Sequence, residues 1–233
     1  MKRCFLITLL FLLFCSLGAS EFEKLKALDE QGVQNPDLYY NLGVTYWQTG
    51  QSGMASLYFL KALHLDSAHK AARENLNYSI RLSKDRDLYP QRLFLVRVFL
   101  EVYDFMNMNR MAVLNLALLI LSSLSLLWYV NYDPAKERGL PGLVLGTMLC
   151  LLLISVSVSA FKAYRIKGNR QAVLLEESAE LRENPEDSAK RVATIHEGVI
   201  LDIRKTAGDW LFVNLPNGDG GWINGELVGR VRQ

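Results

Sequence analysis

Residues 111–130 read MAVLNLALLILSSLSLLWYV and contain no charged side chain. A second uncharged, apolar run extends over residues 140–161. A helix needs about 20 apolar residues to cross the hydrocarbon core of a bilayer, so each run is long enough to span it. We therefore expect transmembrane helices at residues 111–132 and 140–161, joined by a short loop at residues 133–139.

The N-terminus has the layout of a secretory signal. Lys2-Arg3 precedes an apolar run that ends in Gly18-Ala19-Ser20, small residues of the kind found at cleavage sites. We expect a signal peptide at residues 1–20, cleaved after its last residue. An uncleaved anchor and a lipoprotein acylated at Cys15 are the alternatives, and each version exports the segment that comes after it.

Between the signal and the first span, residues 21–86 are expected to form a helical domain. Asn35-Pro36 supplies an N-cap followed by proline in the first helical position, and Gly50 ends that helix. Ser52 and Ser67 are expected to cap a second and a third helix. The segment therefore predicts three short antiparallel helices.

The spacing of residues in these helices resembles the tetratricopeptide repeat. The matching residues, in register with that repeat, are Tyr39, Leu42, Gly43, Tyr46, Ala55, Phe59 and Ala62. Gly43 and Ala55 would let two helices approach closely, while Phe59 would fill the seam between them. Only one repeat is complete, and about three are normally needed for independent stability, so we expect another element to cover its ends.

The resemblance implies a concave groove that binds peptides and is lined by the first helix of each pair. The residues in those positions are Tyr40, Asn41, Val44, Trp47, Asn75, Tyr78 and Arg81. In the alternative interpretation, Trp47 and Tyr78 pack only against neighbouring helices, as aromatic residues at helical spacing usually do.

Residues 87–110 are expected to form a helix at the bilayer interface. Arg97, Glu101 and Asp104 recur on one stripe of an otherwise apolar segment. Such a helix could cover the short repeat array. The alternative is a helix packed within the repeat domain.

The C-terminal residues 172–233 change to short β-prone stretches separated by turns that contain Gly and Asp, which predicts a small antiparallel fold. The sequences Gly208-Asp209-Trp210 and Gly221-Trp222 resemble turns of the bacterial SH3 domain. Such domains often bind peptidoglycan or proteins, so the resemblance implies a docking site near Trp210 and Trp222. In the alternative, both tryptophans only close the barrel.

Several functional classes are disfavoured by composition. The net charge of +2 comes from 26 basic and 24 acidic residues spread along the chain, so a nucleic-acid partner is not expected. The cysteines, Cys4, Cys15 and Cys150, all lie in apolar stretches, which leaves no cysteine nucleophile or zinc cluster in a water-exposed segment. We expect no catalytic residues, metal or cofactor.

The order of the parts resembles BatE-type proteins of the bacterial aerotolerance (Bat) family. The expected fold is multi-domain: an all-α tetratricopeptide-type helical repeat, a two-helix transmembrane hairpin and a small all-β SH3-like C-terminal barrel. The resemblance implies a partnership with exported von Willebrand A-domain membrane proteins. We expect a non-enzymatic scaffold of the cell envelope; the alternative is a membrane-anchored sensor or signalling protein.

The signal would place both water-exposed domains on the periplasmic side of the bacterial inner (cytoplasmic) membrane. The basic linker at residues 162–171 conflicts with this orientation, because basic residues prefer the cytoplasm. It carries four basic residues against two in the loop: Lys162, Arg165, Lys167 and Arg170 against Lys136 and Arg138. We give the signal more weight.

Overall fold

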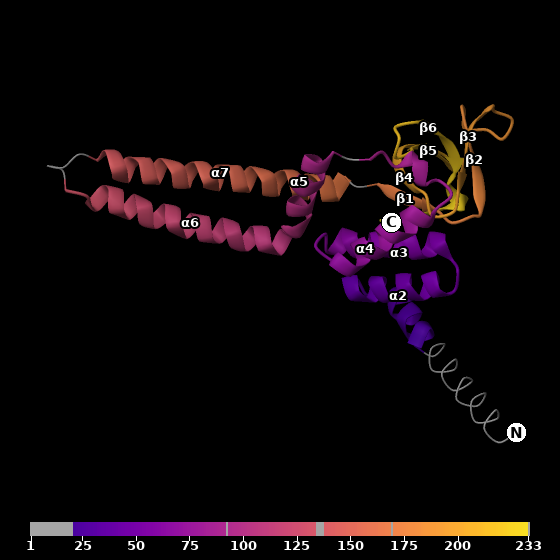
Figure 1. Cartoon of the computed structure of the whole chain (residues 1–233), viewed down its shortest axis with the longest axis horizontal. Coiled ribbons are helices and arrows are strands. Elements are labelled where there is room, and N and C mark those ends of the chain that lie inside the picture. The colour runs from indigo at the N-terminus through magenta and orange to yellow at the C-terminus, as the bar shows by residue number, and fades with distance from the viewer. Residues whose placement is uncertain (1–20, 92, 134–137, 169, 233) are drawn as a thin grey trace, which may run out of the picture. The chain divides into compact units, whose positions relative to one another are not determined.

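The computed structural model describes residues 21–91, 93–133, 138–168 and 170–232 (Figure 1). The signal peptide expected at residues 1–20 and the centre of the expected loop lie outside the described residues. The chain forms two compact units. The helix–barrel unit joins the residues before 92 to those from 170 onward, and the hairpin unit contains the residues between them.

Helices form the N-terminal part of the helix–barrel unit, as the sequence predicts. Residues 21–30 are helical and are followed by α2 (Pro36–Gln48), α3 (Ser52–Leu65), α4 (Lys70–Leu82) and the short 3-10 helix η1 (Arg86–Leu88). The predicted cap of α2 is present. Asn35 Oδ1 accepts hydrogen bonds from the amides of Asp37 at 2.8 Å and Leu38 at 3.2 Å.

The starts of α3 and α4 differ from the prediction. Ser52 is the first residue of α3 and not its cap, and α4 begins at Lys70, after a turn that follows Ser67. The cap of α4 is His69, whose Nδ1 accepts a hydrogen bond from the amide of Ala72 at 3.1 Å. The prediction failed here because an imidazole nitrogen takes the role that Ser, Thr, Asn or Asp usually has.

Helices α2 and α3 pack closely at Gly43. A Cβ atom at this glycine would lie 2.6 Å from Cδ1 of Phe59 and 3.2 Å from the backbone oxygen of Ala55. Phe59 is almost fully buried, so its ring has little room to move away. The helix at residues 21–30 adds Phe22, whose ring meets Tyr46 edge-on at a centroid distance of 5.3 Å.

An antiparallel sheet of seven strands forms the C-terminal part of this unit, in the order β3-β2-β6-β5-β4-β1-β7. Its elements are β1 (Gln171–Leu174), β2 (Ser178–Arg182), β3 (Arg191–His196), β4 (Ile200–Ala207), β5 (Trp210–Asn214), β6 (Gly220–Asn224), η2 (Gly225–Leu227) and β7 (Val228–Arg230). Alternate side chains point to the barrel core, among them Leu211, Val213 and Ile223, which are fully buried.

The barrel covers helix α3. Strands β1 and β7 contact α3, and Val173 of β1 belongs to the hydrophobic core of the helices. A Cβ atom at Gly53 would lie 2.7 Å from the backbone oxygen of Leu174, so the two backbones meet closely. The barrel therefore covers one side of the short helical array, a contact not predicted from the sequence.

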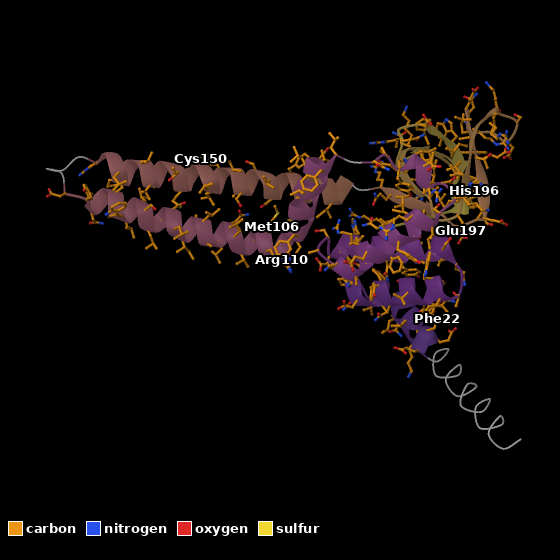
Figure 2. All side chains as sticks on the ribbon, in the orientation of Figure 1. Phe22, Met106, Arg110, Cys150, His196 and Glu197 are labelled. Carbon is orange, nitrogen blue, oxygen red and sulfur yellow. The ribbon has the colours of Figure 1, made fainter. Side chains whose placement is uncertain are left out.

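Polar side chains reinforce this contact (Figure 2). Glu197, in the turn before β4, accepts a hydrogen bond from the amide of Gly53 at 2.6 Å and so caps the start of α3. Asp85, which follows α4, accepts a hydrogen bond from the amide of His196 at 2.5 Å. Its second oxygen lies 2.9 Å from Nδ1 of the same histidine. The barrel thus packs on the helices and caps the start of α3.

The hairpin unit contains α5 (Phe94–Phe105), α6 (Met108–Asn131) and α7 (Gly139–Gly168). Met108–Asn131 and Gly139–Tyr164 are long and apolar enough to cross a membrane, with mean hydropathies of 2.1 and 2.4. Only 11% and 0% of the most apolar stretches of these two helices are buried. Their apolar side chains therefore face outward, unlike those of a core helix in a water-soluble protein. The prediction of two apolar helices is confirmed.

A polar contact joins the two long helices. Asn115 of α6 donates from Nδ2 to Oγ of Ser159 at 3.0 Å and accepts at Oδ1 from Oγ of Ser155 at 2.6 Å. Both ends of this amide are therefore satisfied within the hairpin. Helix α5 occupies the segment where an interfacial helix is expected. The charged side chains of its expected stripe, Arg97, Glu101 and Asp104, lie outside the described residues.

Candidate docking surfaces

The end of the predicted groove is formed by Trp47 of α2 and by Tyr78 and Arg81 of α4. The rings of Trp47 and Tyr78 meet edge-on at a centroid distance of 5.9 Å, and the Arg81 guanidinium lies 5.9 Å from the Tyr78 ring centre. Trp47 is half-buried, whereas Tyr78 remains 49% exposed. The pair therefore packs between helices and still presents aromatic surface to a ligand.

The opposite end of the groove is formed around Tyr40. Its ring lies 5.1 Å from the ring of His69 and 6.1 Å from that of Phe59. Nε2 of His69 in turn lies 3.2 Å from Oδ1 of Asp37, which ties the start of α4 to α2. Of the other predicted groove residues, Val44 and Asn75 are half-buried and Asn41 is exposed.

A cleft of about 500 Å³ lies beside Arg81, where the chain leaves α4. Its lining includes residues that were not predicted from the sequence, chiefly Arg86, Tyr89 and Gln91. The Tyr89 hydroxyl accepts a hydrogen bond from the amide of Ile200 at 3.0 Å. Burial raises the pKa of Tyr89 to about 12, against a smaller lowering by that bond, so the hydroxyl is neutral at physiological pH. This side of the cleft is a fixed part of the helix–barrel contact.

The two tryptophans predicted to dock a ligand lie on the outward face of the barrel. Strand alternation buries Leu211 and Ile223 and leaves Trp210 and Trp222 half-buried on the other side. Trp222 stands directly across from Phe212, and their rings meet edge-on at a centroid distance of 5.4 Å. Both tryptophans are therefore available at the surface.

Trp210 lines a cleft of about 410 Å³ that crosses strands β2, β3, β5 and β6. The remaining lining is mostly polar and charged: Ser178, Ala179, Glu180, Arg182, Asp187, Arg191, Thr194, Asn224 and Leu227. Trp222 of β6 lies on the same face of the sheet, directly opposite Arg182 of the neighbouring strand β2.

Arg182 is held in a fixed position within this cleft. Its Nη2 lies 3.3 Å from Oε2 of Glu180, and its Nη1 donates to the backbone oxygen of Ala189 at 2.9 Å. Arg191 approaches the other oxygen of Glu180 at 3.6 Å. The side chain of Arg182 is only 23% exposed, whereas that of Arg191 is 62% exposed. One planar cation that lines the cleft with Trp210 is thus held in place, and a second, more exposed one is paired with the same carboxylate.

Residues 176–229 match the bacterial SH3 domain. The prediction of an SH3-like C-terminal domain is confirmed for these residues. The matched segment includes β2 to β6 and ends within β7, and it contains both Trp210 and Trp222. Comparison with curated proteins gave no match for the chain.

Strand β1 lies outside the segment that matches the bacterial SH3 domain, yet it is central to the barrel of this chain. It pairs with both β4 and β7. Its Val173 enters the core of the helices, while Ala172 and Leu174 belong to the core of the barrel. The strand before the matched segment therefore joins the SH3 domain to the helices.

Proposed function

We propose that this chain is a non-enzymatic scaffold of the bacterial cell envelope. Helices α6 and α7 anchor it in the inner membrane, and the helix–barrel unit lies on the periplasmic side. The observation that carries the proposal is the outward cleft of the SH3 domain, which combines the half-buried Trp210 ring with the fixed Arg182 and the exposed Arg191.

The chemistry of this cleft suits recognition of a polar polymer. An aromatic ring can stack on a sugar face or a peptide plane, while the arginines can bind carboxylates of peptidoglycan or of a protein. Glu180, a carboxylate of the cleft, is engaged by both Arg182 and Arg191. A carboxylate held between two cations is better suited to positioning a binding surface than to proton transfer.

The N-terminal helices supply a second docking surface in this proposal. The close contact at Gly43 and Phe59 supports a tetratricopeptide repeat, since that repeat places a small residue at this helix crossing. The exposed face of Tyr78 and Arg81 would then bind a protein. By resemblance to BatE-type proteins, its partners would be von Willebrand A-domain membrane proteins of an aerotolerance system.

Binding to isolated peptidoglycan tests the SH3 part of the proposal. The purified full chain in detergent is mixed with sacculi and sedimented, and Trp210→Ala is compared with Trp128→Ala in α6. We expect Trp210→Ala to weaken binding at least about tenfold. Truncation of an aromatic anchor in a binding cleft commonly lowers the affinity by that factor or more.

The Trp128→Ala protein controls for the loss of a tryptophan outside the SH3 domain, and it should bind like the unmodified chain. Thermal unfolding checks that the Trp210→Ala barrel is intact. Unchanged binding by a folded Trp210→Ala protein would remove the cleft from the proposal. Failure of the unmodified chain to sediment with sacculi would leave protein, and not wall polymer, as the ligand.

A further inference from the structure

The C-terminal end of α5 is bound by cations from both spanning helices. Lys162 of α7 donates from Nζ to the backbone oxygens of Tyr103 at 2.6 Å and Met106 at 2.7 Å. Arg110 of α6 donates from Nη1 to the backbone oxygen of Phe105 at 2.6 Å. The last carbonyls of a helix carry partial negative charge and need donors, and these two side chains supply them.

Lys162 is in an unusual environment for a lysine, because only 2% of it is exposed. Its ammonium also lies 4.3 Å from the centre of the Tyr103 ring, a cation–π contact. It stands directly after the uncharged run that ends at residue 161. The end of α5 is therefore fixed at the level where the apolar part of α7 stops.

The short connection between α5 and α6 also fixes the position of the end of α5 along the hairpin. Only Met106 and Asn107 separate α5 from α6, and Asn107 Oδ1 caps α6 by accepting from the amide of Arg110 at 2.9 Å. Figure 1 shows α5 running across the direction of α6 and α7. Figure 2 shows Met106 and Arg110 near each other at this turn. The helix thus crosses the hairpin at the end of its apolar surface.

Helix α5 exposes large apolar side chains, several of them on one side. Leu95, Val98 and Phe105 recur at spacings that place them on the same side of a helix, and they are 78%, 40% and 61% exposed. At the other end of the short α5–α6 turn, the exposed apolar surface continues with Val113 and Leu116 of α6, which are 68% and 58% exposed. The exposed apolar surface of α5 is therefore followed, across a two-residue turn, by the exposed apolar surface of a helix long enough to cross a membrane.

We propose that α5 lies in the plane of the membrane, with this face inserted at the boundary between the headgroups and the acyl chains, and that Lys162 is the positioning residue that holds it there. The partner is the lipid surface on the side of the membrane where α6 begins. This goes beyond the scaffold proposal, which requires only that the chain be anchored.

Spin-label depth measurement tests the position of α5. Cys4, Cys15 and Cys150 are replaced by Ser, Leu95→Cys is labelled with a nitroxide, and the full chain is placed in vesicles of phosphatidylethanolamine and phosphatidylglycerol. Leu82→Cys, in the helix–barrel unit, gives the aqueous reference, and Leu116→Cys in α6 gives the hydrocarbon reference. We expect the label at residue 95 to report a depth between these two references. Collisions of this label with oxygen should be more frequent than its collisions with a water-soluble nickel complex.

Two results would overturn the in-plane helix. A label at residue 95 as accessible to nickel as the label at residue 82 would place α5 in water. A label shielded from both oxygen and nickel would show that protein covers this face, through the helix–barrel unit or a second copy.

The role of Lys162 is tested in the same labelled protein. Lys162→Met keeps an apolar stem but removes the donors, and we expect the label at residue 95 to become more mobile and several-fold more accessible to nickel. Lys162→Arg should restore the original depth. If Lys162→Met cannot be reconstituted, Arg110→Gln removes the other cation from the same helix end. A depth unchanged by loss of the cation would contradict the positioning role.

Discussion

At the scale of single residues, the helix–barrel unit depends on a few positions where helices and strands touch. The bonds from Gly53 to Glu197 and from Asp85 to His196 each connect the helices to a barrel residue more than 100 positions away in sequence. Asn35 could be recognised as a cap from the sequence because its partners are the next residues. The cap that Glu197 provides could not, since it depends on the folded position of the barrel.

Replacement of Gly53 by Ala tests this contact. Alanine favours an exposed helix over glycine by up to about 1 kcal/mol, which alone would stabilise α3. However, its Cβ would lie 2.7 Å from the backbone oxygen of Leu174, and backbone cannot move aside easily. We expect a net loss of about 1–3 kcal/mol in the free energy of unfolding, measured by chemical denaturation of the full chain in detergent.

The matched control is Gly146→Ala in α7. No described atom lies within 4 Å of a Cβ built at this glycine, so the helix–barrel unit should unfold as before. A Gly53→Ala protein as stable as the unmodified chain would show that the barrel backbone does not lie in close contact with α3 at this position.

Tyr89 should make stability fall at alkaline pH. Burial raises its pKa from 10.0 to about 12, so the folded state holds the phenol proton more tightly than the unfolded state. Its stabilising contribution is complete below pH 10.0 and is lost as the pH rises through about 12. Burial also raises the pKa of Tyr39, Tyr46 and Tyr58, which act in the same direction.

We expect Tyr89→Phe to be less stable at neutral pH by about 1 kcal/mol, because the amide of Ile200 loses its acceptor. Between pH 9 and pH 11 it should lose less stability than the unmodified chain, since one titrating phenol is gone. Denaturation curves at both pH values measure the difference. An equal alkaline loss in the two proteins would mean that Tyr89 is not the group that titrates.

At the scale of elements, the hairpin shows which features a sequence determines. Two uncharged runs were enough to predict α6 and α7, because length and apolarity decide whether a helix can span a bilayer. The pairing of Asn115 with Ser155 and Ser159 could not be predicted, since it depends on how the two helices are rotated about their axes.

Removal of the Asn115 amide should weaken the hairpin. Asn115→Ala leaves the hydroxyls of Ser155 and Ser159 without this partner between helices, and we expect a loss of roughly 0.6–1.7 kcal/mol in the stability of the membrane domain. Unfolding of the reconstituted chain in mixed micelles measures it. Ser123→Ala is the control, because Ser123 Oγ donates within its own helix, to the backbone oxygen of Leu119 at 2.8 Å. Equal effects of the two substitutions would exclude a role in helix pairing.

At the scale of the whole molecule, the helices and the SH3 domain form one unit although the hairpin separates them in sequence. The type of each part could be predicted from periodicity and turn residues. The contact between them could not, because it joins chain segments on either side of the hairpin. Similarly, Trp210 could be singled out from its turn, whereas its place in one cleft with Arg182 and Arg191 became recognisable only from strand pairing.

This arrangement has a consequence for function. The barrel occupies one face of α3 and leaves uncovered the two surfaces proposed for docking, the predicted groove of α2 and α4 and the outward cleft of the SH3 domain. A ligand on each surface would be held by the same compact unit. A scaffold of this design can present a protein partner near the wall polymer without a flexible linker between the two sites.

Photo-crosslinking in living cells tests the central claim most directly. A photoreactive amino acid replaces Asn224 in the SH3 cleft, Asn75 in the groove or, as a control, Asn217 at the tip of a turn. We predict light-dependent adducts with peptidoglycan or an exported protein from Asn224, adducts with an exported membrane protein from Asn75, and far fewer from Asn217. Adducts confined to cytoplasmic proteins, or equal yields from all three positions, would contradict an envelope scaffold that docks through these surfaces.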